Sequence, residues 1–145
     1  MEFEETVTIQ RPVEEVFAYM SNAENDAKWR TNVKEIRQVT EGEKGVGTEY
    51  RQVVKGPMGK GLDADLRYTE FKPNERVAFE TIAGSVRPSA VIEFKALSAD
   101  STQVHMHMTW VPEGGAKAGA PMIKRMIEKD LKASYANLVK MMESR

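Results

Sequence analysis

The sequence has no cysteine, two histidines and no excess of charge of either sign. Without cysteine the chain can form neither a disulfide nor a thiolate nucleophile or metal site, which fits a reducing compartment. Its 21 basic and 22 acidic residues give a formal charge of −1. A chain so balanced has no strong field to attract nucleic acid or an anionic membrane, so we expect neither as a partner.

Long hydrophobic runs are also missing. No apolar stretch is long enough to span a bilayer, so we expect no integral membrane association. The acidic start, residues 1–5, lacks the basic segment and apolar run of a signal peptide, which predicts a cytoplasmic protein. With 145 residues, 41% of them hydrophobic, the chain suits a single domain over residues 1–145, and we expect a monomer or weak dimer.

Seven segments alternate apolar and polar side chains, the pattern of strands that bury one face. Clusters of glycine, proline, asparagine and serine separate consecutive segments and predict tight turns, hence hairpins. The expected strands are residues 3–10, 33–40, 48–55, 61–71, 75–83, 88–97 and 102–111.

Two short helices are predicted between the first and second strands. Pro12 stands at a helix start and is followed by apolar residues at i, i+3, i+4 and i+7 spacing. Ser21 and Glu24 have the spacing of a capping box, which predicts a second helix from about Asn22 toward Trp29.

A long final helix is predicted for residues 118–142, with Leu131 and Leu138 buried. Asp130 and Ser134 fall within the arc of its apolar residues. Burying an unpaired polar group costs about 1–3 kcal/mol, so such groups suit a helix that faces a partly hydrated pocket. Asp130 is therefore a weak candidate for a general acid or base. The alternative interpretation places Asp130 at the edge of the apolar arc, paired with a lysine or arginine.

These elements predict an α+β fold: a curved seven-stranded antiparallel sheet wrapped around the long C-terminal helix. A strongly bent sheet leaves a gap between its concave face and the helix, and the two short helices can close one end of it. We expect a ligand-binding pocket there, and the alternative is a plain packed core. The expected lining combines apolar, aromatic and a few polar side chains: Trp29, Tyr50, Gln52, Leu66, Tyr68, Phe79, Phe94, Met106, Met108, Trp110, Met126, Ile127, Asp130 and Ser134.

The two histidines, His105 and His107, share one face of the last predicted strand. Two ligands are too few for a zinc site, and their parity places them opposite Met106 and Met108, on the outer face of the sheet. We therefore expect no metal, no cofactor and no Ser-His-Asp triad.

The order of elements, together with four local motifs, resembles the START-like helix-grip superfamily (SRPBCC), in particular its polyketide cyclase/dehydrase and lipid-transport branch. The resemblance covers the whole chain. Members often carry a proline directly after the tryptophan of the second helix, whereas Arg30 follows Trp29 here. The motifs are residues 9–17, Trp29, residues 45–48, and the strand with Val104, Met106 and Trp110.

The resemblance implies a hydrophobic or amphipathic cavity but no single chemistry. The leading prediction is binding of a small hydrophobic or amphipathic ligand, lipid-like or polyketide-like, between the sheet and the C-terminal helix. One alternative is a polyketide cyclase/dehydratase-type enzyme that uses the same cavity. A second is a co-chaperone-like protein-interaction module, which would need an exposed apolar patch.

Overall fold

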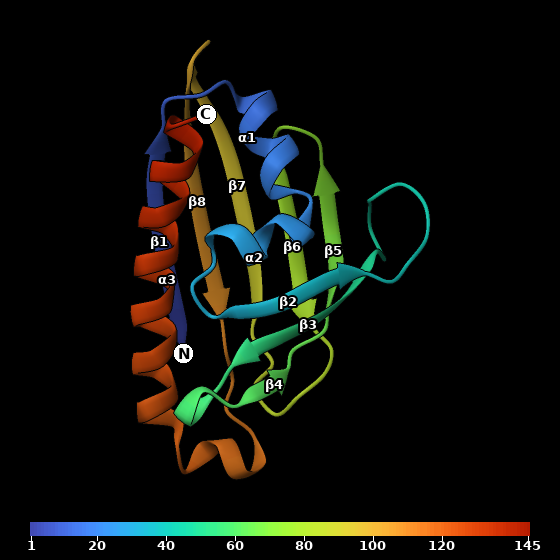
Figure 1. Cartoon of the computed structure of the whole chain (residues 1–145), viewed down its shortest axis with the longest axis vertical. Helices are drawn as coiled ribbons and strands as arrows, with labels where there is room; N and C mark the ends of the chain where they lie inside the picture. The colour runs from blue at the N-terminus through green and yellow to red at the C-terminus, as the bar shows by residue number, and fades with distance from the viewer.

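The computed structural model describes all 145 residues, as one antiparallel sheet, two short helices near the N-terminus and a long C-terminal helix (Figure 1). The strands are β1 (Glu2–Ile9), β2 (Val33–Gln38), β3 (Glu49–Lys55), β4 (Gly61–Asp63), β5 (Leu66–Lys72), β6 (Arg76–Thr81), β7 (Ser89–Ser98) and β8 (Ser101–Thr109). The α-helices are α1 (Val13–Met20), α2 (Asp26–Trp29) and α3 (Ala120–Glu143), and the 3₁₀ turns are η1 (Ala23–Asn25), η2 (Pro57–Gly59) and η3 (Gly114–Lys117). No helix is both long and apolar enough to cross a membrane.

The sheet follows the strand order β1-β8-β7-β6-β5-β3-β2, and this path confirms the seven predicted strands. β4 is a short addition that pairs with β3 alone. The segment 61–71, expected as one strand, divides at Ala64 and Asp65. There the carbonyl of Gln52 accepts from the Ala64 N–H at 2.8 Å, and the Asp65 carboxylate accepts from the Gln52 N–H at 3.2 Å. The division lets β3 pair with β4 at one end and with β5 at the other.

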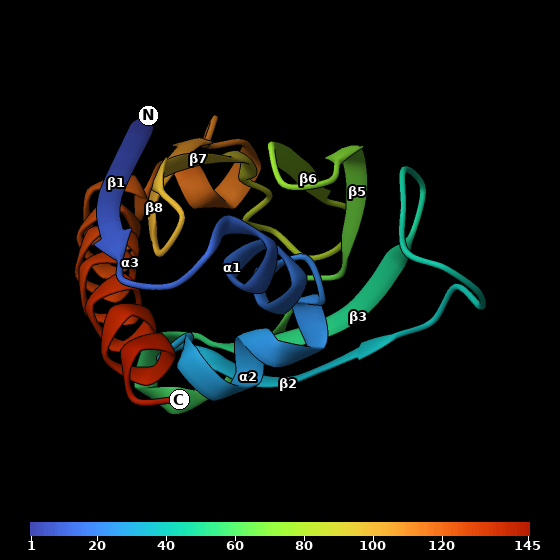
Figure 2. The same ribbon diagram turned by 90° about the horizontal axis from the view of Figure 1, so that it is seen from above.

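The sheet curls strongly, so that its two edge strands, β1 and β2, approach each other around the short helices (Figure 2). α3 runs beside β1 and reaches α2, which lies against β2. Leu131 and Leu138 are 3% and 0% exposed, as predicted. The long helix therefore closes the open side of the curled sheet.

α1 plugs one end of the curled sheet (Figure 2). Pro12 is its N-cap, with the φ of −60° that proline requires, and the apolar stripe of the helix points inward. The Phe17 ring packs edge-to-face on Phe94 of β7, with ring centroids 5.2 Å apart. The packed rings of Phe17 and Phe94 therefore close one end of the space inside the curled sheet.

The second predicted helix is η1 followed by α2, but its cap differs from the predicted capping box. Asn22, not Ser21, accepts the Glu24 N–H, at 3.2 Å. Ser21 is instead the C-cap of α1, and its carbonyl accepts from the Tyr68 hydroxyl at 2.7 Å. The Glu24 carboxylate reaches away from the helix and accepts from the Gln38 N–H of β2 at 2.9 Å. Ser21 therefore ends the preceding helix, and Asn22, one residue later, caps the following one.

The turn between β3 and β4 contains a strained residue. Met58 has φ +62° and is fully exposed, so its side chain contributes no packing. A non-glycine residue in this left-handed conformation costs about 1–2 kcal/mol, and glycine avoids that cost but loses more entropy on folding. We expect Met58→Gly to raise the free energy of unfolding by about 0.5–1 kcal/mol in urea titrations. Met58→Ala keeps the strain and is the matched control, expected to stay near the wild type. Equal stability of the glycine and alanine variants would contradict the strain at this position.

Candidate functional site

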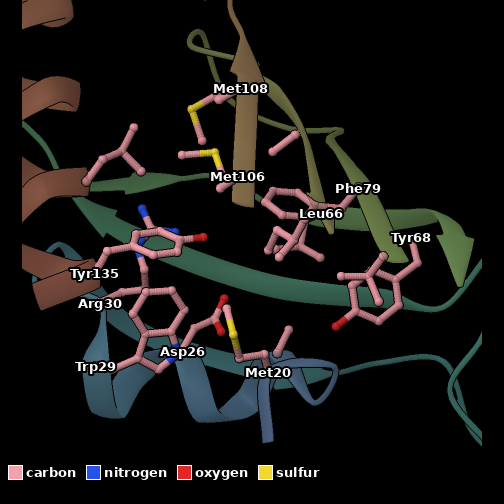
Figure 3. A pocket seen from close by; sticks show the side chains of 15 residues that line it. Met20, Asp26, Trp29, Arg30, Leu66, Tyr68, Phe79, Met106, Met108 and Tyr135 are labelled. Carbon is pink, nitrogen blue, oxygen red and sulfur yellow. The ribbon is translucent and has the colours of Figure 1, made fainter. Parts of the chain in front are cut away.

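A pocket lies between the inner face of the sheet, the α1–α2 cap and α3 (Figure 3). Thirteen of its 15 lining residues are hydrophobic. The enclosed space is about 20 Å³, which holds about one water molecule. The pocket is therefore almost filled by its own side chains. The lining residues are Met20, Ala23, Asp26, Trp29, Arg30, Leu66, Tyr68, Val77, Phe79, Ala90, Ile92, Met106, Met108, Leu131 and Tyr135.

The structure brings six of the fourteen candidate residues together around this pocket. Tyr68 and Phe79 come from the paired strands β5 and β6, and Met106 and Met108 from β8. Each has the inward parity that the alternation predicted. The six are Trp29, Leu66, Tyr68, Phe79, Met106 and Met108.

Five other candidates from the apolar set lie elsewhere. Phe94 and Trp110 are buried at 6% and 1% exposure but do not line the pocket. Tyr50 is buried behind Tyr68, with ring centroids 5.4 Å apart, and Ile127 packs against the core. The placement of Met126 in the pocket is wrong, because its side chain is 37% exposed. Met126 is five residues before Leu131, and at about 100° per residue it lies about 140° around the helix from that inward position.

The three polar candidates, Gln52, Asp130 and Ser134, form hydrogen bonds or an ion pair with other groups of the protein. Gln52 donates from Nε2 to the Ala64 carbonyl at 3.0 Å and supports the division between β4 and β5. Asp130 forms an ion pair with Arg30 at 3.0 Å, and Ser134 accepts from the Thr31 N–H at 2.9 Å. The Asp130 carboxylate also accepts from the Thr31 hydroxyl. Of the two interpretations of Asp130, the structure matches the one with a paired carboxylate at the edge of the apolar arc.

These contacts join the corner after α2 to the middle of α3. Besides Asp130 and Ser134, Asn137 of α3 donates to the Trp29 carbonyl at 3.0 Å. The backbone of Arg30 has φ −74°, a value that proline also adopts. Unlike proline, Arg30 donates its backbone N–H, to the Asp26 carbonyl at 2.8 Å. It also brings a guanidinium to the edge of the pocket.

Asp26 is the one acidic residue in the pocket lining, and its carboxylate points into the pocket (Figure 3). Burial raises its pKa from 3.8 to about 7, because the charged form loses hydration. The nearby Arg30 guanidinium and the Trp29 indole N–H oppose this rise only in part. A carboxyl group that titrates near neutral pH is suited to exchange a proton with a bound molecule.

One buried polar atom of the pocket lining, Arg30 Nε, has no hydrogen-bond partner. The hydroxyl of Tyr135, on α3, also points into the pocket, and the Tyr135 ring packs edge-to-face on Trp29 with ring centroids 5.1 Å apart (Figure 3). Buried polar groups without partners are rare in folded proteins and call for an explanation. Polar capacity is therefore concentrated at one end of an otherwise apolar pocket.

Sequence reasoning missed Asp26, Arg30 and Tyr135, although spacing carried a signal for each. Asp26 and Arg30 lie three residues before and one residue after Trp29, so all three share one side of a short helix. Tyr135 is four residues after Leu131 and three before Leu138, which places it on the buried stripe.

His105 and His107 lie on the outer face of the sheet, as their parity predicted. Their rings are about one-third exposed and approach Glu4 at 3.6 Å and Glu2 at 2.8 Å, respectively. Neither ring reaches the pocket, which is on the other face of β8.

An antiparallel sheet that curls around a long C-terminal helix is the START-like helix-grip fold. The family model described as "Polyketide cyclase / dehydrase and lipid transport" matches residues 1–143. The chain belongs to this family.

The chain is also similar to several known proteins. A 17.2 kDa protein of Streptomyces lincolnensis is 29% identical over 133 residues, which cover 88% of this chain and 83% of the relative. The Zhui aromatase/cyclase of a Streptomyces species superposes with a TM-score of 0.77 at 16% identity, over 99% of this chain and 92% of that one. A START superfamily protein of Mycobacterium smegmatis superposes with a TM-score of 0.76 at 16% identity, over 99% and 97% of the two chains. At these identities the superpositions establish the fold alone.

Proposed function

We propose that the protein binds a small, largely apolar ligand, lipid-like or polyketide-like, in the pocket between the sheet and α3. The observation that carries the proposal is the lining: thirteen hydrophobic residues with Asp26 and Arg30 gathered at one end. A pocket that is mostly apolar, with a few polar groups at one place, is typical of small-molecule sites. The apolar part binds the body of the ligand and the polar end orients it.

The small enclosed volume means that a ligand must displace side chains on entry. Met20, Met106 and Met108 surround the space, and methionine changes rotamer more readily than branched or aromatic residues. Burying about 200 Å² of apolar ligand surface contributes roughly 5 kcal/mol before the costs of association. Micromolar binding therefore also needs the polar end.

A cyclase- or dehydratase-type reaction in the same pocket is the second candidate. The position of Asp26 favours it, since a carboxyl group with a pKa of about 7 can act as acid or base at neutral pH. Two structural neighbours that are described as aromatase/cyclases, from Streptomyces and from the BE-7585A biosynthetic pathway, support the same idea.

The binding function is tested by titration with N-phenyl-1-naphthylamine, an uncharged apolar dye that becomes fluorescent in apolar surroundings. We expect saturable binding by the wild type and at least about tenfold weaker binding by Met108→Trp, because the added ring fills the pocket. Overpacking a nearly filled pocket also costs about 1–3 kcal/mol of stability, so circular dichroism must show that the variant is folded.

His107→Trp is the matched control, since residue 107 is the neighbour of Met108 on the opposite face of β8. The control is expected to bind the dye like the wild type. Undiminished dye binding by folded Met108→Trp would place the ligand site outside this pocket.

A further inference from the structure

The polar end of the pocket has an acceptor and a donor that face the same space. The Asp26 carboxylate points into the pocket next to the Trp29 indole (Figure 3). The Tyr135 hydroxyl points into the same space from α3 (Figure 3). An acceptor and a hydroxyl donor that face one space match a ligand group that both donates and accepts.

We propose that this end of the pocket recognises a hydroxyl group of the ligand, which donates to the Asp26 carboxylate and accepts from the Tyr135 hydroxyl (Figure 3). This inference rests on the proposed binding function and specifies the chemistry of the ligand.

The charges of this region disfavour a carboxylate ligand. Arg30 is the one cation in the pocket lining, and its guanidinium already pairs with Asp130 at 3.0 Å. An anionic ligand would therefore meet two carboxylates, Asp26 and Asp130, against one guanidinium that is already engaged. A neutral hydroxyl avoids this repulsion and leaves the ion pair intact.

An ether or a bare hydrocarbon is disfavoured for a different reason. Neither can donate to Asp26, so the carboxylate would lose any remaining water on ligand entry and gain no hydrogen bond in return. The ether oxygen could accept from the Tyr135 hydroxyl, but the Asp26 carboxylate would stay unpaired. The pocket should therefore distinguish a hydroxyl from its methyl ether, two groups of almost the same shape.

Asp26 is the group that changes charge near neutral pH in this cluster. Burial raises the pKa of each tyrosine around it, and the neighbouring carboxylates raise the pKa of the arginine, so these groups keep their ordinary protonation at pH 8. The groups coupled to Asp26 are Tyr19 on α1, Arg30 after α2, Tyr50 on β3, Tyr68 on β5 and Tyr135 on α3.

The test measures calorimetric binding of 2-naphthol, 2-methoxynaphthalene and 2-naphthoate to the whole chain at pH 8. We expect 2-naphthol to bind about tenfold or more tightly than its methyl ether, the usual size of one hydrogen bond to a charged group, and 2-naphthoate to bind weakest. In Asp26→Leu, which keeps the branched shape and removes the acceptor, 2-naphthol and the ether should bind equally. Asp26→Asn keeps a neutral acceptor and should restore part of the preference.

A pH series adds a second readout. Lowering the pH to 5 protonates Asp26 and should reduce the preference for 2-naphthol over the ether in the wild type, but not in Asp26→Leu. Equal affinity of wild type for 2-naphthol and the ether at pH 8 would overturn the hydroxyl inference and leave the binding function standing. Binding of neither probe would overturn both.

Discussion

Replacing Asp26 with asparagine is expected to remove a fall in stability that the wild type shows between about pH 4 and pH 7. In the folded protein the pKa of Asp26 is raised from 3.8 to about 7 by burial. Between these values the folded chain keeps a proton that the unfolded chain has lost. Because the folded state binds more protons, the free energy of unfolding decreases as the pH rises through this window, and it levels off above about pH 7.

A shift of about three units corresponds to roughly 4 kcal/mol, which is the upper limit of the effect. We therefore expect Asp26→Asn to match the wild type near pH 4 and to exceed it by up to about 4 kcal/mol at pH 8. Urea unfolding at pH 4, 5.5 and 8 measures the difference. Asp100→Asn, at an exposed carboxylate in the turn between β7 and β8, is the control and should leave the pH dependence unchanged. A pH slope in Asp26→Asn equal to that of the wild type would show that this carboxyl is not buried.

The second large effect is expected at the ion pair between Arg30 and Asp130. The two side chains are 14% and 12% exposed, so removing one partner leaves a charge poorly hydrated. We expect Asp130→Ala to lower the free energy of unfolding by about 3–5 kcal/mol, the usual cost of breaking a buried pair. The Thr31 and Ser134 hydrogen bonds to the same carboxylate would be lost with it.

The double variant Arg30→Met, Asp130→Leu should recover much of this loss, because two apolar side chains need no partners. A double-mutant cycle from urea unfolding gives the coupling energy. Glu80→Ala is the comparison at the surface: Glu80 approaches Arg67 at 2.5 Å, but both side chains are about 40% exposed, and the expected loss is below about 1 kcal/mol. Equal losses in Asp130→Ala and Glu80→Ala would mean that water reaches the Arg30 pair freely.

The sequence was sufficient to predict which face of each strand is buried, because alternation with a period of two depends on local residues alone. Met106 and Met108 line the pocket and His105 and His107 lie outside, as their parity required. The set of residues of the long helix that were expected to face the pocket was too wide. Met126 lies on the exposed side, because several turns of apolar residues do not show by themselves where the neighbouring elements end.

The partner of Asp130 could not be predicted, because the pair depends on a contact between elements far apart in the chain. Arg30 and Asp130 are 100 positions apart and meet because the corner after α2 lies against α3. The small volume of the pocket could not be predicted from the sequence either. It depends on how Met20 and the facing side chains pack, and alternation does not encode packing.

The position of α3 beside β1 also affects how copies of the chain behave toward one another. β1 pairs with β8 on one side, which leaves its other edge with backbone groups that a strand from another molecule could pair with. α3 runs along this strand, and the exposed carboxylates of Glu2 and Glu4 add charge that discourages such pairing. A chain shortened before Ala120 would uncover that edge. We expect such a chain to aggregate by strand-to-strand pairing, because the helix that closes the pocket also covers the free edge of β1.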